Sequence, residues 1–163
     1  MRALLLTVLS TLLLACTSEI PAPMLPVSAF GSIAQNELIT LEAGDRVFAF
    51  TARLESDGET LKVVAITPTG QRLFSITRTG EQLLTEPGVL WPRAMPLQAV
   101  WADIEMVHAP AAMSVASPWQ RIRNQDSNDW LYHGKKLAQV KHEAGKITLT
   151  RDAYTLTIEI LPE

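Results

Sequence analysis

The feature that most constrains the fold is a series of short segments in which apolar and polar residues alternate. Four such runs lie between residues 47 and 86: VFAFTARLE, TLKVVAIT, QRLFSITR and EQLLTE. Five more lie between residues 119 and 161: WQRIRN, DWLYHG, KKLAQVKHE, KITLTR and AYTLTIEIL. A period of two is typical of β-strands, and connecting pairs such as Asp57-Gly58 suit tight hairpin turns. The sequence therefore predicts four or five antiparallel strands, an interruption, and about five more strands.

The interruption has the spacing of a helix. Five apolar residues recur there at intervals of three and four: Leu97, Val100, Trp101, Ile104 and Val107. This spacing predicts a helix with one apolar face, and Pro96 suits its first turn. A weaker helical segment, AAMSVASP, follows it. We interpret His108, at the expected end of the helix, as structural, because the helix dipole favours a cation there.

These elements predict a mainly β fold with an α lid, in which a single curved antiparallel sheet forms a half-open barrel. The helix would cover the concave face, and such a covered barrel suits an acyl chain. The expected cavity residues are Phe48, Phe50, Val64, Ile66, Phe74, Ile76, Leu149, Leu156 and Ile158 from the strands, with Trp101 and Ile104 from the helix. The same pattern also fits a tight core with no space left, and the sequence leaves this alternative open.

The first residues, MRALLLTVLSTLLLAC, have the layout of an export signal. Arg2 precedes an apolar stretch that ends at Ala15, within the usual length of about 7–15 residues for a signal peptide and short of the roughly 20 that span a membrane. We predict a signal peptide over residues 1–15. Residues 16–36, which contain several prolines, are expected to form a lipidated N-terminus and a tether, and residues 37–163 a single domain.

The stretch Leu13-Leu14-Ala15-Cys16 resembles the bacterial lipobox. The resemblance implies cleavage between Ala15 and Cys16, a diacylglycerol thioether on Cys16, and an acyl chain such as palmitate on the new amino group. Several acyl chains give a stable anchor, and the lone cysteine excludes an intrachain disulfide. Thr17, rather than Asp, after the lipidated cysteine implies sorting to the outer membrane. The alternative is an ordinary signal peptide with a chance cysteine.

Composition and motifs argue against several function classes. The net charge is −3, or −4 without Arg2, and no block of Lys or Arg offers a surface for nucleic acid. The sequence has no G-x-S-x-G, Walker A or H-E-x-x-H motif and no cysteine pair. Asp103 and Glu105 would point to different faces of the helix, which argues against a catalytic carboxylate pair. We therefore predict no enzyme, no metal site, and no cofactor apart from the lipid on Cys16.

The stretch AITPTGQRLFSI, followed about twenty residues later by MPLQAVWADI, resembles the LolB-type outer-membrane lipoproteins. More narrowly, it resembles an uncharacterised family of small LolB-related lipoproteins that are often encoded beside genes for aryl-polyene lipid synthesis. The C-terminal strands GKITL and YTLTI match as well, so the resemblance spans about residues 45–161. It implies a LolA/LolB-like, eleven-stranded half-open barrel covered by helices. In LolB the cavity accepts acyl chains of lipoproteins from the periplasmic carrier LolA and passes them to the outer membrane.

The loop Pro68-Thr69-Gly70 departs from the LolB pattern, which has leucine between the proline and the glycine. That leucine is thought to enter the membrane, and a threonine there gives up roughly 1.5–3 kcal/mol of apolar burial. The resemblance therefore implies cavity binding more directly than delivery. Leu83, Leu84 and residues 87–91 are candidates for a substitute apolar tip, although they also suit a core.

Together these features predict a lipid-anchored protein of the outer membrane, facing the periplasm, that binds acyl chains and acts in lipoprotein or aryl-polyene lipid transfer. Expected partners are outer-membrane lipids, an acylated lipoprotein or polyene lipid as cargo, and a LolA-like carrier. The alternative is a non-catalytic scaffolding lipoprotein of an envelope assembly machine. A cavity of several hundred Å³ would favour the carrier, and a filled core with an exposed apolar patch would favour the scaffold.

Overall fold

The computed structural model describes residues 21–162, so the predicted signal peptide, its cleavage site at Ala15 and the lipidation site Cys16 lie outside the described residues. Ten strands form one antiparallel sheet in the order β5-β4-β3-β2-β1-β10-β9-β8-β7-β6. The elements are η1 (Val27–Phe30), β1 (Ser32–Ala43), β2 (Arg46–Asp57), β3 (Thr60–Ile66), β4 (Arg72–Thr79), β5 (Gln82–Pro87), α1 (Leu97–His108), β6 (Trp119–Arg123), β7 (Ser127–Tyr132), β8 (Lys135–Glu143), β9 (Lys146–Thr150) and β10 (Thr155–Leu161).

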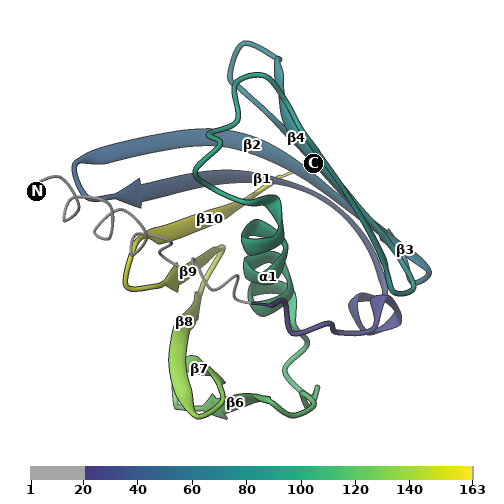
Figure 1. The fold of residues 1–163 in the computed structure, drawn as a ribbon, viewed down its shortest axis with the longest axis vertical. Helices are drawn as coiled ribbons and strands as arrows, with labels where there is room; N and C mark the ends of the chain where they lie inside the picture. The colour runs from purple at the N-terminus through teal and green to yellow at the C-terminus, as the bar shows by residue number, and fades with distance from the viewer. Residues whose placement is uncertain (1–20, 163) are drawn as a thin grey trace, which may run out of the picture.

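The sheet consists of two hairpin-connected halves joined along one pair of strands. β1 pairs with β10, with Ile39 opposite Ile158, although these two strands are far apart in the sequence. All other strands that are neighbours in the sheet are consecutive in the sequence. The long strands β1 and β2 curve around the core (Figure 1). The outer strands β5 and β6 are not paired with each other, so the sheet is curved but unclosed. The predicted mainly β fold with one curved antiparallel sheet is confirmed, with ten strands in place of the eleven that the resemblance implies.

One helix, α1, lies in the hollow of the sheet and connects its two halves (Figure 1). Three of the five residues on the predicted apolar face are buried, Leu97, Trp101 and Val107, whereas Val100 and Ile104 are half-buried. Asp103 and Glu105 are buried as well, which the spacing did not predict. The helix begins directly after Pro96, which is its N-cap rather than part of its first turn. The prediction of a second helical segment, AAMSVASP, is wrong, because residues 111–118 form turns and irregular backbone. Among the described residues no helix is long and apolar enough to cross a bilayer.

The folded part of the chain begins earlier than the sequence indicated. Leu25, Val27 and Phe30 are buried, and β1 already starts at Ser32. The predicted tether is therefore wrong for residues 21–36, which contribute to the core. The described residues enclose one continuous hydrophobic core, so we expect them to fold as a unit.

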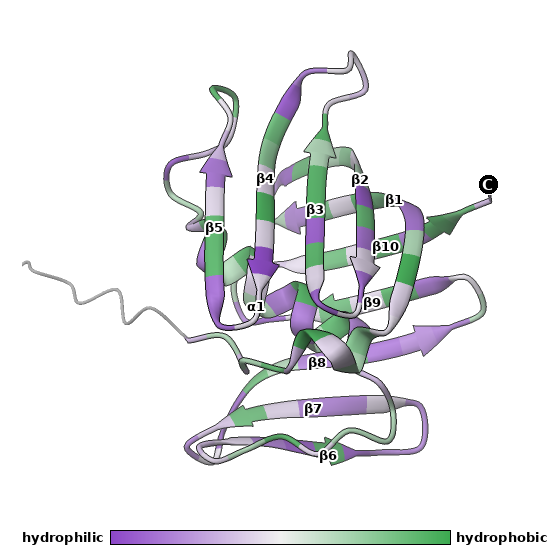
Figure 2. Ribbon diagram, turned by 90° about the vertical axis from the view of Figure 1, so that its right-hand side faces the viewer, coloured by the Kyte–Doolittle hydropathy of each residue, from purple (hydrophilic) through white to green (hydrophobic). Residues whose placement is uncertain are grey.

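β3 presents the opposite face to the core from the one predicted. The C-terminal half of this strand is hydrophobic without interruption (Figure 2). Leu61, Val63 and Ala65 are buried, because the register sets Val63 between Leu54 of β2 and Ile76 of β4. The prediction that Val64 and Ile66 line the cavity is wrong: Val64 is half-buried on the other face and Ile66 is exposed. Both faces of β3 are apolar in sequence, so the alternation alone did not decide between them.

Candidate functional site

A small apolar cavity, here called the inner cavity, lies between α1 and the concave face of the sheet. Five residues that the sequence assigned to a cavity do line it: Phe50, Phe74, Ile104, Leu156 and Ile158. Ile76, Trp101 and Leu149 are fully buried in the core but do not line the cavity, and Phe48 is half-buried at the edge of the core. The helix and strands of the predicted site therefore do come together around one apolar space.

The inner cavity has a volume of about 40 Å³. That is room for a few water molecules, whereas pockets for small ligands usually measure roughly 300–1,000 Å³. The core is therefore almost filled in this conformation, and the cavity is well below the several hundred Å³ expected of an open carrier.

A larger and more open groove, here called the outer groove, lies beside it along the end of β5 and the segment that leads into α1. Its volume is about 540 Å³, and its lining includes Pro87, Val89, Pro92 and Leu97. Trp91 and Met95 line both the groove and the inner cavity. These two side chains therefore form a shared wall, which we call the Trp91–Met95 gate.

The Trp91–Met95 gate is held closed by specific contacts. Trp91 Nε1 donates a hydrogen bond to the Met95 carbonyl oxygen at 2.8 Å. The indole ring also packs edge-to-face on Phe74, with 4.7 Å between the ring centroids, and lies 6.3 Å from the ring of Phe50. Such aromatic pairs add to the stability gained from apolar burial. Trp91 thus fastens the loop after β5 to the cavity wall.

Gly88 allows that loop to approach β4 closely. Its N–H donates to the Leu73 carbonyl oxygen at 2.7 Å. A Cβ at this position would lie 2.3 Å from the Arg72 carbonyl oxygen and 2.7 Å from that of Leu73, distances that backbone atoms cannot accommodate without a shift. Glycine is therefore required at position 88, where the segment that leads to Trp91 packs against the backbone of β4.

One end of the inner cavity is polar. Glu37 of β1, together with Asp103 and His108 of α1, belongs to its lining. His108 Nε2 lies 3.1 Å from Glu37 Oε1, and Gln35 Nε2 donates to the same oxygen at 2.6 Å. The predicted structural role of His108 is thus specific: it joins the end of the helix to a buried acidic residue of β1.

Asp103 is held by two residues that lie between β9 and β10. Arg151 donates to Asp103 Oδ1 through Nε at 2.7 Å, with its Nη2 at 2.6 Å from the same oxygen, and the Tyr154 hydroxyl donates to Oδ2 at 2.5 Å. Burial raises the pKa of Asp103 against the opposing effect of the Arg151 charge. Burial also raises the pKa of Tyr154, and the Asp103 charge adds to this.

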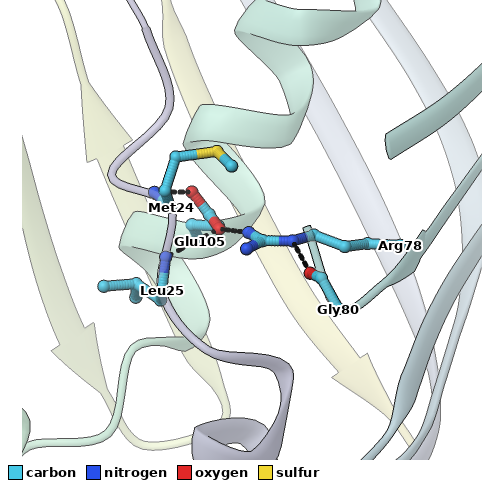
Figure 3. A network of polar contacts seen from close by, with 5 residues as sticks. All are labelled: Met24, Leu25, Arg78, Gly80 and Glu105. Atoms are coloured by element: carbon cyan, nitrogen blue, oxygen red, sulfur yellow. Dashed lines mark hydrogen bonds and ion pairs between the residues drawn. The ribbon is translucent and has the colours of Figure 1, made fainter. Parts of the chain in front are cut away.

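Glu105 ties α1 to β4 and to the N-terminal segment (Figure 3). It does not belong to the lining of the inner cavity. Arg78 Nη1 donates to Glu105 Oε1 at 2.5 Å, and the backbone N–H groups of Met24 and Leu25 donate to the same carboxylate at 2.9 and 3.0 Å. Arg78 also donates to the Gly80 carbonyl oxygen. Burial raises the pKa of Glu105 to about 7, against the effects of Arg78 and of the two N–H donors.

The loops at one end of the sheet differ in polarity. Thr69 lies in the β3–β4 loop, where its hydroxyl contacts that of Thr67 at 2.8 Å. The loop after β5 lies at the same end (Figure 2), where Val89 is fully exposed and Leu90 is 54% exposed. Of the other candidates for an apolar tip, Leu84 is 60% exposed and Leu83 is half-buried. We call Val89 and Leu90 the apolar tip.

Sequence reasoning missed several residues of the site. Glu37 was overlooked because an acidic residue on a strand ordinarily faces solvent, and Trp91 and Met95 because they lie outside any periodic segment. Val100 and Val107, by contrast, were on the predicted apolar face of the helix and do line the cavity. A tryptophan among prolines and a glycine, in PGVLWPRAMP, was the available signal for an anchored loop.

A family sequence model, described as protein of unknown function (DUF3261), matches residues 34–162. The chain belongs to this family. The DUF3261 match begins within β1 and ends just after β10, so it includes the sheet apart from the first two residues of β1, and also α1, both linings and the gate. No curated protein matches the chain.

Proposed function

We propose that this protein is a carrier that binds an acyl chain between α1 and the concave face of the sheet. It would be anchored to the outer membrane through lipid on Cys16, face the periplasm, and act in the transfer of lipoproteins or aryl-polyene lipids. The observation that carries the proposal is the arrangement of two adjoining spaces, an apolar inner cavity and an open outer groove, with the Trp91–Met95 gate between them.

Loading requires the gate to open, because about 40 Å³ does not accommodate an acyl chain. Displacement of the Trp91 and Met95 side chains would join the inner cavity to the outer groove. Each methylene that enters is worth about 0.8 kcal/mol of transfer free energy, so a long chain offsets the cost of separating the gate from the core. The driving force is hydrophobic and needs no covalent step.

The apolar tip supports delivery at a membrane. Thr69 provides no apolar contact in the β3–β4 loop, but Val89 and Leu90 stand exposed at the same end of the sheet, and Val89 also lines the outer groove (Figure 2). Burying one such side chain contributes about 1.5–3 kcal/mol. In this proposal the tip contacts outer-membrane lipids, and the groove receives an acylated lipoprotein or polyene lipid from a LolA-like carrier.

The second candidate function is a scaffolding lipoprotein of an envelope assembly machine. The small volume of the inner cavity favours it, as do the exposed side chains of Leu84, Val89 and Leu90. In this case the core stays closed, and the exposed apolar residues bind a protein partner.

The two candidates are separated by uptake of a neutral lipophilic dye, N-phenyl-1-naphthylamine, into the chain from residue 17 onward, produced without Cys16 and without detergent. We expect the wild-type protein to bind the dye. Ile39→Phe, which fills the inner cavity, should weaken binding by about fivefold or more through overpacking. Val47→Phe, at a position of β2 that is 68% exposed, is the matched control and should bind as the wild type does.

Either of two results would contradict the carrier. If the folded wild-type protein takes up no dye, the scaffold is the better candidate. If Ile39→Phe and Val47→Phe bind the dye equally well, the dye does not occupy the inner cavity.

A further inference from the structure

The polar end of the inner cavity is built around a buried acceptor. Glu37 is 3% exposed and lies on the concave face of β1, on the same side as the apolar residues Ile39 and Leu41. Its Oε1 already faces Gln35 and His108. Its Oε2 has no hydrogen-bond partner within residues 21–162. This oxygen is not one of the fully buried atoms that lack a partner, so it borders accessible space, and it can accept a hydrogen bond from a ligand that enters the cavity.

The neighbouring charged groups leave no unengaged cation for an anionic ligand, because His108 already contacts Glu37. Asp103, the other acidic residue in the lining, has both oxygens occupied by Arg151 and Tyr154. Among the described residues that line the cavity there is no Lys or Arg. Burial lowers the pKa of nearby His142 on β8, and the proximity of His108 lowers it further. A second carboxylate placed here would therefore compete with Glu37 for His108, with no Lys or Arg in the described lining to compensate.

We propose that the buried polar end of the cargo is an uncharged hydrogen-bond donor, a hydroxyl or an amide N–H, that donates to Glu37 Oε2. This inference rests on the carrier function proposed above and adds the chemical class of its ligand. The apolar wall binds the alkyl chain, whereas Glu37 rejects a free fatty-acid carboxylate by like-charge repulsion in a poorly solvated site. An ester without a donor leaves Oε2 unpaired and gains less.

Displacement of the bound dye by three ligands with a dodecyl or lauroyl chain tests this inference, each used below its solubility limit and, for laurate, below its critical micelle concentration. The ligands are dodecanol, which has a donor, methyl laurate, which has none, and laurate, which is anionic. We expect dodecanol to displace the dye at roughly tenfold lower concentration than laurate and at about threefold lower concentration than methyl laurate.

Variants of two residues on β1 test whether Glu37 causes the preference for dodecanol over laurate. Glu37→Gln keeps the size of the side chain and removes the charge, so the advantage of dodecanol over laurate should fall to about threefold or less. Glu42→Gln, on the exposed face of the same strand, should keep the wild-type ranking. If Glu37→Gln does not fold, the ranking of the three ligands by the wild-type protein still decides.

The outcomes separate this inference from the carrier function. Equal binding of the three ligands, or preference for laurate, would overturn the donor requirement and leave the carrier intact. An unchanged ranking in folded Glu37→Gln would exclude Glu37 as its cause. Failure of the wild-type protein to bind the dye or any of the ligands would overturn both.

Discussion

At the scale of single residues, α1 is fastened to the rest of the fold by three of its own polar side chains. Asp103 contacts Arg151 and Tyr154 between β9 and β10, Glu105 contacts Arg78 of β4, and His108 contacts Glu37 of β1. Buried charges contribute little net stability when they are paired and cost much when one partner is lost. The three contacts instead fix the position of α1, namely its rotation and its height over the concave face. Apolar packing alone would define this position less sharply.

The first prediction concerns Glu105. Glu105→Gln should lower the free energy of unfolding by about 3–5 kcal/mol, because Arg78 would remain buried with no opposite charge. Chemical denaturation measures this change. Glu81→Gln, at an exposed position in the turn after β4, is the control and should change stability by less than about 0.5 kcal/mol. A loss of under about 1 kcal/mol for Glu105→Gln would show that the pair does not hold the helix.

The sequence predicted the apolar part of the site better than its polar part. Phe50, Phe74 and Leu156 follow from strand periodicity, which places them on the concave face. Asp103 and Glu105 were expected to diverge, and they do bind different partners, but their burial was not predicted. Partners such as Arg151 for Asp103 are 48 residues away in the sequence, so only the folded sheet brings them together.

At the scale of elements, the predicted strands and helix correspond closely to the observed ones where a single period dominates. β9 is an example, since Ile147 and Leu149 form its one apolar face. β1 was not recognised, because Gln35 and Glu37 occupy inward positions and obscure the alternation. The segment with η1 was not recognised either, because its buried residues Leu25 and Val27 lie among prolines without a period. Tertiary contacts, rather than local pattern, order both segments.

The second prediction concerns the gate. Trp91→Phe keeps an aromatic ring beside Phe74 but removes the donor to the Met95 carbonyl oxygen. The closed form should lose about 0.5–1.5 kcal/mol, and dye uptake measured by stopped flow should become several-fold faster. Trp119→Phe, a buried tryptophan of β6 outside the gate, should leave the rate unchanged. An unchanged rate in Trp91→Phe would place the path of the ligand elsewhere.

At the scale of the whole molecule, the open sheet leaves α1 and its flanking segments to complete the enclosure. β1 and β10 join the two halves, whereas β5 and β6 stay apart. On the β6 side, Arg121 donates to the carbonyl oxygens of Pro110, Ala111 and Met113, which holds the segment after α1 in place. On the β5 side the corresponding closure is the Trp91–Met95 gate. We expect a ligand to enter on the β5 side, because there the gate alone separates the inner cavity from the outer groove.

The measurement that tests the carrier most directly is the identification of lipid bound to the native protein. The chain from residue 17 onward would be produced in the periplasm of a Gram-negative host and purified without detergent. Native mass spectrometry would then measure the mass of the intact protein with any bound lipid. We expect a species that carries one acyl-chain lipid, present for the wild-type protein and for Val47→Phe, and lost in folded Ile39→Phe. A lipid-free wild-type protein that also fails to take up the dye would contradict the carrier function.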